Sequence, residues 1–336
     1  MIIQLKKDIG TKDRQGIIQK LEKIKYKTTE VVTQKGNYLI GTGKRDFDIR
    51  EIGFMNGIQD IHIVSDNYKL VSRKWKVNPT SIDLGDEVKI GAGHFAIMAG
   101  PCSIEGKENI DDTLAHLKEN GIRIMRGGVY KPRSSPYAFR GLGIDGLKIW
   151  YQAAKTAGIK IITEVMQVSQ IEPMYDYIDI YQVGARNTQN FNLLDALGKV
   201  DKPVMIKRGI SGTIDELLYS AEYVFAGGNE SLMLCERGIR TYETASRNTL
   251  DLNAIPILKE KTHLPVIADP SHGIGLRQFV EPMALASIMA GADGVIYETH
   301  DIPEDAFSDG QQTLDFKEST RLVRKMNETY MLRDSW

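Results

Sequence analysis

The chain has 336 residues, of which 42% are hydrophobic and 26% charged, a balance typical of a folded globular protein. The formal net charge is -1, so no overall basic field points to nucleic acid or to an anionic membrane surface. The two cysteines form no disulfide framework pattern. No apolar run has the length of a spanning helix, and the first residues lack the apolar core of a signal peptide. We therefore expect a cytoplasmic protein.

Residues 1–65 have the pattern of a small, separate domain. A strand is expected at residues 1–5, and a helix then carries Ile17, Ile18, Leu21 and Ile24 on one face. Strands at 29–33 and 38–41, joined by a turn, a short helix at 49–55 and a strand at 60–64 complete the domain. The order β-α-β-β-α-β is the ferredoxin-like split motif. Such domains bind amino acids or pair with copies of themselves, and a packing module without a ligand is the alternative.

After a polar, basic segment at residues 66–91, assigned as linker and barrel entry, residues 92–336 alternate strands with helices. Apolar strands are expected at 95–99, 122–125, 160–163, 178–183, 204–206, 232–234, 266–268 and 294–297. Helical patterns lie between them at 110–120, 147–157, 191–197, 214–225, 252–261 and 282–290. Eight such units predict a (β/α)8 barrel. A doubly wound open sheet is the alternative, but no G-x-G-x-x-G follows the first strand.

Cations follow the second, fourth, fifth and sixth expected strands, at the positions that form the functional face of a barrel. They are Arg126, Lys131, Arg133, Arg186, Lys207 and Arg237. The first three lie in RGGVYKPRSSPY, residues 126–137, where two prolines stiffen the loop. Guanidinium groups form paired hydrogen bonds with phosphates and carboxylates. Their convergence at one mouth predicts a strongly anionic substrate that is phosphorylated more than once.

Potential metal ligands follow the first, seventh and eighth strands. They are Cys102, His272, Glu298 and Asp309. One thiol, one imidazole and two carboxylates suit several divalent transition metals. Taken singly, each residue has a plainer explanation, such as a buried small side chain for Cys102 or a solvated loop acid for Asp309. Their joint placement at barrel exits favours a metal site, whereas Cys235 is expected only to pack and His300 has no assigned role.

Six motifs in order carry a family resemblance: AGPCSIEG, RGGVYKPRSSPY, GARN, MIKRG, CERGIRTYE and ADPSHGIG. Together they resemble 3-deoxy-D-arabino-heptulosonate 7-phosphate (DAHP) synthase, in its compact type with a ferredoxin-like (ACT-like) regulatory domain in front. The resemblance covers roughly residues 92–330, and the barrel fold that it implies agrees with the strand pattern. It implies condensation of phosphoenolpyruvate with erythrose 4-phosphate to give DAHP and phosphate, the first step of the shikimate pathway to aromatic amino acids.

The resemblance also implies site residues, each with one role or two. The metal ligands, for one divalent ion per subunit such as Mn²⁺, Fe²⁺ or Zn²⁺, are Cys102, His272, Glu298 and Asp309. The phosphoenolpyruvate site comprises Arg126, Lys131, Glu164, Ala185, Arg186, Lys207 and Arg237. The erythrose 4-phosphate loop comprises Lys131, Pro132, Arg133 and Ser134, where Ser134 stands at a position that is often Thr in the family.

For catalysis, the implied roles fall on Lys131, Glu164, Cys102 and His272. Lys131 is expected to protonate the new alkoxide, and Glu164 to orient the attacking water. Cys102 and His272 are expected to act through the metal, which makes the sugar aldehyde electrophilic. The front domain is expected to respond to tyrosine or phenylalanine as a feedback inhibitor, and the assembly to be a homotetramer.

Three alternatives stay open. The nearest is the sister enzyme that makes 3-deoxy-D-manno-octulosonate 8-phosphate from arabinose 5-phosphate, whose sugar loop typically has Lys-Ala-Asn-Arg where this chain has Lys131-Pro132-Arg133. A Schiff-base aldolase that uses Lys207 is a second. The third is an amino-acid sensor whose barrel has no activity, although an intact set of ligands and cations opposes it.

Overall fold

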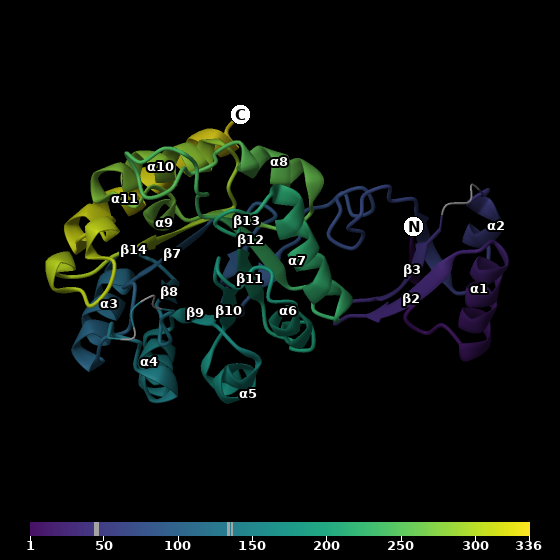
Figure 1. Cartoon of the computed structure of the whole chain (residues 1–336), viewed down its shortest axis with the longest axis horizontal. Coiled ribbons are helices and arrows are strands. Elements are labelled where there is room, and N and C mark those ends of the chain that lie inside the picture. Colours follow the sequence, from purple (N-terminus) through teal and green to yellow (C-terminus); the bar gives the residue numbers. More distant parts are fainter. Residues whose placement is uncertain (44–46, 133–134, 136) are drawn as a thin grey trace.

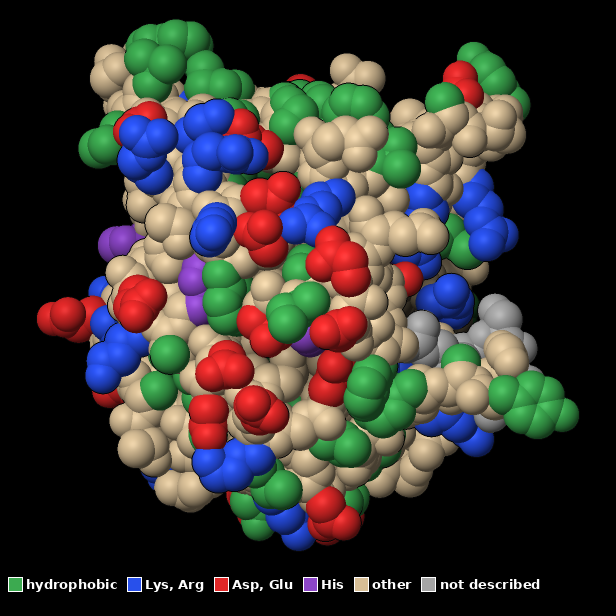
Figure 2. Space-filling view, turned by 90° about the vertical axis from the view of Figure 1, so that its left-hand side faces the viewer, with side chains coloured by type: hydrophobic (Ala, Val, Ile, Leu, Met, Phe, Trp, Pro, Cys, Tyr) green, Lys and Arg blue, Asp and Glu red, His purple; other side chains and the backbone are tan. Residues whose placement is uncertain are grey.

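A closed barrel and a small four-stranded sheet lie side by side along the longest axis of the chain (Figure 1). This arrangement is seen in a computed structural model that describes residues 1–43, 47–132, 135 and 137–336. Charged side chains of both signs, interspersed with small apolar groups, cover the side of the barrel shown in Figure 2. No helix in the described ranges combines the length and the apolar character needed to cross a membrane.

The small sheet has the predicted ferredoxin-like order of elements. They are β1 (Ile2–Leu5), α1 (Thr11–Lys23), β2 (Lys27–Val32), β3 (Asn37–Thr42), α2 (Arg50–Gly53) and β4 (Ile58–His62). The strands pair antiparallel in the order β2-β3-β1-β4. Ile3, Leu39 and Ile17 are fully buried in a core of their own between sheet and helices. Apolar and β-branched residues are frequent in β1, β2 and β3, which explains why the sequence predicted this sheet.

The turn between β2 and β3 docks on the barrel. Thr33 Oγ1 donates a 2.6 Å hydrogen bond to Glu230 Oε1, and the Lys35 backbone N–H donates to the same oxygen at 3.1 Å. Glu230 is only 2% exposed, so these donors compensate a carboxylate that the fold removes from water. Tyr38 of β3 packs edge-on against Trp75, with ring centroids 5.4 Å apart. The small sheet is thus held to the barrel by packing as well as by the connecting chain.

The segment at 66–91, expected as linker and barrel entry, contains a hairpin that is anchored to the barrel. β5 (Ile82–Asp83) and β6 (Lys89–Ile90) form a short hairpin. Ile82 and Ile90 join the buried cluster inside the barrel, next to residues that begin their strands, such as Ala96. The hairpin therefore closes the amino-terminal end of the barrel. Its few apolar residues are separated by charges and glycines without a regular period, so no pattern revealed them.

Eight parallel strands close the barrel, as predicted. They are β7 (Ala96–Gly100), β8 (Ile124–Arg126), β9 (Lys160–Val165), β10 (Ile180–Val183), β11 (Val204–Lys207), β12 (Leu232–Glu236), β13 (Val266–Ala268) and β14 (Gly294–Glu298). The pairing of β14 with β7 completes the ring, and it sets Glu298 opposite Gly100.

The helices that surround the barrel include the six predicted ones, the long C-terminal helix α11 and short helices. They are α3 (Lys107–Glu119), α4 (Gly143–Ala157), α5 (Ile171–Met174), α6 (Phe191–Leu197), α7 (Ile214–Ala226), α8 (Ala254–Lys261), α9 (Pro270–Ile274), α10 (Arg277–Met289) and α11 (Phe316–Asp334). A capping box begins α7, because Thr213 accepts from the Glu216 N–H and the Glu216 carboxylate accepts from the Thr213 N–H. The sequence did not reveal α11, whose exposed face is strongly polar.

His263, just before β13, fastens residues 66–91 to the barrel. Its Nδ1 lies 2.7 Å from Thr80 Oγ1, and its Nε2 lies 2.8 Å from the Leu70 carbonyl oxygen. The carbonyl can only accept, so Nε2 carries the proton and Nδ1 accepts from Thr80. Burial lowers the pKa of His263 to about 3. Both hydrogen bonds therefore depend on a neutral imidazole.

We predict a loss of stability in mild acid that is attributable to His263. The unfolded chain takes up a proton near pH 6.5 while folded His263 stays neutral, so this contribution is present above pH 6.5 and is lost as the pH falls. The loss should reach about 2 kcal/mol by pH 5. His263→Gln should flatten the decline in unfolding temperature between pH 7 and pH 5, whereas His94→Gln, at an exposed position, should not. Equal slopes in both variants would refute the assignment.

Candidate active site

Closure of the barrel brings three donor side chains together. Cys102 follows β7, Glu298 ends β14, and Asp309 lies in the loop after β14. Their ligand atoms all lie within 4.8 Å of one another. Cys102 Sγ donates to Asp309 Oδ2 at 3.2 Å. A soft sulfur and two carboxylates at this spacing could hold a divalent ion.

The surroundings shift the pKa values of Cys102 and Asp309 in opposite directions. Burial, followed by the charge of Glu298, raises the pKa of the Cys102 thiol to about 12. Burial also disfavours the charged form of Asp309, but His272 and Arg247 outweigh it and lower the pKa of this carboxyl to about 2. Asp309 has a left-handed backbone with φ 53°, a conformation that is costly for a side-chain-bearing residue and frequent at functional sites. The site thus keeps its carboxylates ionised beside a protonated thiol.

His272 approaches this group from the short helix α9. Asp269 caps the helix and accepts from the His272 backbone N–H at 3.0 Å. The Asp269 Oδ2 also lies 2.8 Å from His272 Nδ1, which leaves Nε2 on the side of Glu298, 3.5 Å from its Oε1. Burial lowers the pKa of His272 against the pull of the Asp269 and Glu298 charges, so the neutral, ligating form is favoured.

Two predicted cations also touch the donor group. Arg126 is 5% exposed, and its Nη1 donates to Glu298 Oε1 at 3.1 Å and to the Pro101 carbonyl at 2.8 Å. Its Nε has no hydrogen-bond partner among the described residues, so this buried donor is left for a ligand. Lys131 Nζ lies 3.0 Å from both the carbonyl oxygen and Sγ of Cys102.

Gly128 makes the approach of Lys131 possible. A Cβ at this position would lie 2.6 Å from Lys131 Cδ and 3.1 Å from the Cys102 carbonyl oxygen. Either contact would displace the lysine or the loop that carries the thiol. The Gly-Gly step after β8 therefore serves the site, because it lets the side chain of Lys131 lie directly on the backbone.

The remaining cations surround the same mouth at different depths. Lys207 is 4% exposed and its ammonium forms an ion pair with Asp269. Arg237 is 7% exposed, and burial lowers its pKa even though Asp269 and other charges oppose the shift. Arg186 is exposed, and together with Ala185 it lines a cavity of about 360 Å³ beside the loop at 209–212.

Glu164, at the end of β9, is half-buried and packs against the backbone of Gly184. Pro132 is half-buried as well. The predicted residues Arg133 and Ser134 lie outside the described residues, so this part of the sugar loop stays a prediction. Cys235 packs in the barrel interior, as expected.

Three described side chains that touch the predicted site received no role from the sequence. Asp269 joins Lys207 to His272, Gln312 bonds Glu298, and Arg247 bonds Asp309. A carboxylate three residues before a possible histidine ligand was a usable signal for Asp269, because ligating histidines usually donate their second N–H to such a group. Arg247 and Gln312 gave no such signal. His300 has an ion-pair contact with Asp301, at 2.7 Å, rather than with the donor group.

A closed barrel with a buried, charged mouth at the carboxyl ends of its strands defines the class of (β/α)8-barrel enzymes. The chain belongs to the DAHP synthetase I family, whose model matches residues 74–334. A curated relative from Thermotoga maritima, phospho-2-dehydro-3-deoxyheptonate aldolase, is 51% identical over 261 residues, which are 78% of this chain and 77% of the relative.

Solved structures and more distant relatives agree with this placement. The crystal structure of the Thermotoga maritima phospho-2-dehydro-3-deoxyheptonate aldolase (DAHP synthase) superposes with a TM-score of 0.78 at 42% identity, and covers 99% of this chain and 97% of that one. A truncated form of the Thermotoga synthase covers 80% of this chain and 97% of its own, with a TM-score of 0.74 at 46% identity. A 2-dehydro-3-deoxyphosphooctonate aldolase from Syntrophobacter fumaroxidans is 29% identical over 266 residues, 74% of this chain and 91% of the relative.

The buried pair Lys207–Asp269 gives a stability prediction. Asp269→Ala leaves an uncompensated ammonium in the barrel and should lower the free energy of unfolding by about 3–5 kcal/mol. Lys207→Met combined with Asp269→Ala removes both charges and should restore part of that loss, because the cap of α9 and the contact with His272 are still missing. Denaturant titration of the single and double variants measures both effects. Asp215→Ala, which breaks the exposed pair with Lys261, is the control and should cost less than about 1 kcal/mol. Additive losses in the double variant would contradict the ion-pair account.

Proposed function

We propose that this protein is a DAHP synthase that condenses phosphoenolpyruvate with erythrose 4-phosphate and releases phosphate, at the entry to the shikimate pathway. The observation that carries the proposal is the joining of the two predicted groups at one barrel mouth. Arg126 belongs to the cations and Glu298 to the donors, and their side chains are 3.1 Å apart. The family membership and the 51% identity to the Thermotoga enzyme support the same reaction.

The relatives favour this reaction over that of the sister enzyme. The 2-dehydro-3-deoxyphosphooctonate aldolases from Syntrophobacter fumaroxidans and Caulobacter vibrioides are 29% and 31% identical, well below 51%. The sequence Lys131-Pro132-Arg133 also differs from the sister enzyme's typical sugar loop. We therefore assign erythrose 4-phosphate as the second substrate and place it at Lys131, Pro132, Arg133 and Ser134.

Phosphoenolpyruvate carries a phosphate and a carboxylate, and the cation set suits both. The proposed site consists of Arg126, Lys131, Glu164, Ala185, Arg186, Lys207 and Arg237. Buried Arg126 and Arg237 would bind oxyanions strongly because little water screens them. The exposed Arg186 at the rim would meet the anion first. The Arg126 Nε supplies one donor that no described residue uses.

The donor set fits a divalent metal ion. Cys102, Glu298 and Asp309 already converge, and His272 has the ring orientation that a ligand needs. We propose these four residues as the ligands of one ion per subunit, of the Mn²⁺, Fe²⁺ or Zn²⁺ type. When bound, such an ion supplies Lewis acidity toward the aldehyde oxygen of the sugar.

The protein's own groups would carry the remaining steps. The methylene carbon of phosphoenolpyruvate attacks the aldehyde carbon, which forms the new C–C bond and leaves an alkoxide. Lys131, whose ammonium contacts the carbonyl oxygen and Sγ of Cys102, would protonate that oxygen. Water then adds to the cationic C2, and Glu164 is proposed to orient it. The hemiketal phosphate finally loses inorganic phosphate by C–O cleavage, which gives the 2-keto product.

The ion pair of Lys207 argues against the Schiff-base alternative. A nucleophilic lysine must present a free amine, whereas the Lys207 ammonium is held by Asp269 in the buried wall of the barrel. Lys207 is better suited to bind an anion as a fixed cation. Borohydride reduction in the presence of substrate should therefore leave the protein's mass unchanged.

We predict that Lys131→Met abolishes DAHP formation while the chain still binds Mn²⁺. The substitution keeps the length of the side chain but removes the proton donor, and a positioned general acid contributes about 10²–10⁴-fold to a rate. Phosphoenolpyruvate consumption and Mn²⁺ titration are measured on the same preparation. Lys148→Met, at an exposed position on α4, is the control and should keep full activity. Turnover by Lys131→Met near the wild-type rate would remove Lys131 from its proposed role.

The reaction itself is tested by phosphoenolpyruvate consumption with erythrose 4-phosphate, before and after chelation and after Mn²⁺ is added back. We expect activity that is lost with the chelator and restored by the metal. Arabinose 5-phosphate should support much less turnover. Consumption with arabinose 5-phosphate alone would identify the sister reaction, and no consumption with either sugar would favour the sensor.

For the small domain we propose feedback inhibition by tyrosine or phenylalanine within a cytoplasmic homotetramer. Residues 1–65 form the regulatory domain in this proposal, residues 66–91 the entry to the barrel, and residues 92–336 the catalytic barrel. The small sheet has its own core and docks on the barrel through Thr33 and Tyr38, a route by which effector binding can reach the barrel. A truncated form of the Thermotoga synthase, which covers 80% of this chain, has a solved structure, so a shortened chain of this family can fold.

We predict that a variant without residues 1–65 stays active but loses inhibition by aromatic amino acids. Residues 66–91 must be kept, because Ile82 and Ile90 close the barrel. Inhibition curves for tyrosine and phenylalanine are compared between the full and shortened chains, and sedimentation reports the assembly of each. A full chain that neither amino acid inhibits would favour the packing-module alternative.

A further inference from the structure

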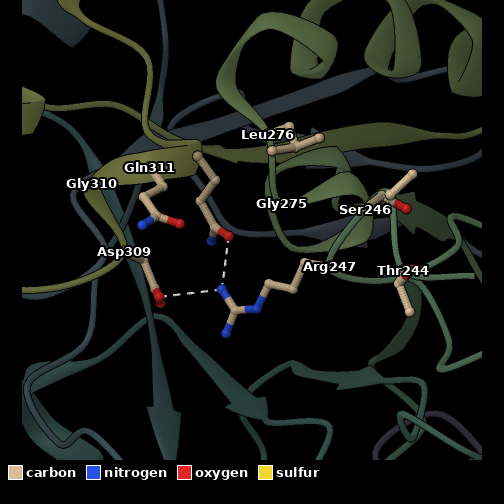
Figure 3. Close-up of a pocket in the computed structure, with 10 residues that line it drawn as sticks. Thr244, Ser246, Arg247, Gly275, Leu276, Asp309, Gly310 and Gln311 are labelled. Atoms are coloured by element: carbon tan, nitrogen blue, oxygen red, sulfur yellow. Dashed lines mark hydrogen bonds and ion pairs between the residues drawn. The ribbon is translucent and has the colours of Figure 1, made fainter.

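Arg247 reaches the donor group from the segment between β12 and α8 (Figure 3). Its Nη1 lies 3.2 Å from Asp309 Oδ1 and 2.8 Å from Gln312 Oε1. Figure 3 shows a pocket lined by Ser246, Gly275 and Gln311 among others, in which the Arg247 guanidinium points toward the chain at Asp309 and Gly310. One cation of a different loop thus contacts the β14 loop at two points.

Gln312 links Arg247 to Glu298 through two hydrogen bonds. The residue is 1% exposed, and its Nε2 donates to Glu298 Oε2. Its Oε1 accepts from Arg247, so both ends of the amide are used and its orientation is fixed. Three residues, Arg247, Gln312 and Glu298, form a continuous chain of hydrogen bonds from the pocket to the end of β14.

The two carboxylates are held in the same way. In each, one oxygen is bound from outside the donor group: Asp309 Oδ1 by Arg247, and Glu298 Oε2 by Gln312. The other oxygen lies among the donors. Asp309 Oδ2 contacts Cys102 Sγ, whereas Glu298 Oε1 lies 3.5 Å from His272 Nε2 and also accepts from Arg126. The bonds from Arg247 and Gln312 therefore fix the orientation of both carboxylates and direct one oxygen of each toward the other donors.

We propose that Arg247 and Gln312 are positioning residues that orient Asp309 and Glu298 for metal binding, so that the segment between β12 and α8 helps to build the metal site. The proposal rests on the metal site put forward under the proposed function. It adds two residues that touch neither the metal nor the substrate, and it assigns a role to a loop that also begins with Arg237.

Replacing Arg247 tests this proposal, because two explanations of its role predict opposite changes in metal affinity. If Arg247 were merely a nearby cation, its removal would relieve repulsion and strengthen metal binding. If it orients the ligands, its removal should weaken binding, and loss of a group that orients a ligand typically costs about 10–100-fold in metal affinity. Arg247 is 43% exposed at its side chain, so its replacement should leave the fold intact.

The experiment titrates Mn²⁺ into the metal-free full-length chain by calorimetry, without substrate. We expect Arg247→Gln to raise the dissociation constant about 10–100-fold and Arg247→Lys to restore only part of the loss, because an ammonium cannot bridge two acceptors as a guanidinium does. Gln312→Leu should weaken binding in the same direction. Arg240→Gln, at an exposed position of the same segment, is the control and should bind as the wild type does.

A second readout separates orientation from general damage. With Co²⁺, the intensity of the thiolate-to-metal absorption band should fall in Arg247→Gln, and KM for phosphoenolpyruvate at saturating Mn²⁺ should stay unchanged. Equal or tighter Mn²⁺ binding by Arg247→Gln would overturn the positioning role while the proposed function stands. A wild-type chain that binds no Mn²⁺ or Co²⁺ would overturn the proposed metal site, and this proposal with it.

Discussion

The pairing of β14 with β7 is the constraint on which the site depends. It closes the barrel and, through the register that sets Glu298 opposite Gly100, brings the end of the last strand beside the loop after the first. Cys102 and Asp309 are 207 positions apart in the chain, yet a hydrogen bond joins them. An open sheet would leave these groups at opposite edges. The convergence of the donors is thus a direct product of closure. Arg126, whose Nε has no hydrogen-bond partner within the described part of the chain, contacts the same group.

Charge compensation is the second theme of the structure. Buried cations at the mouth are paired with carboxylates, as in Lys207 with Asp269 and Arg126 with Glu298. This pairing removes the repulsion that a cluster of bare cations would suffer before an anion binds. Glu298 faces both Arg126 and His272, so the buried cations and the donor group share a carboxylate and their charges are coupled.

The barrel was predictable because its strands are short apolar runs that alternate with helical patterns. Arg126, Lys207 and Glu298 could be predicted as site residues because each lies at the end of such a strand. Side-chain partners were not predictable in the same way. Gln312 is a polar residue in a polar segment, and only the three-dimensional path of the chain brings its amide to Glu298. The hairpin of β5 and β6 escaped notice because a two-residue strand has no period to detect. The motif at 126–137 indicated the function more specifically than the order of strands and helices did.

The most direct test of the account is a crystal structure of the full chain with Mn²⁺ and phosphoenolpyruvate, with the metal located by its anomalous signal. The account predicts a single peak within bonding distance of Cys102, His272, Glu298 and Asp309. It also predicts the phosphate and carboxylate of phosphoenolpyruvate on the guanidinium groups of Arg126 and Arg237. A metal bound elsewhere, or an anion away from the barrel mouth, would contradict it.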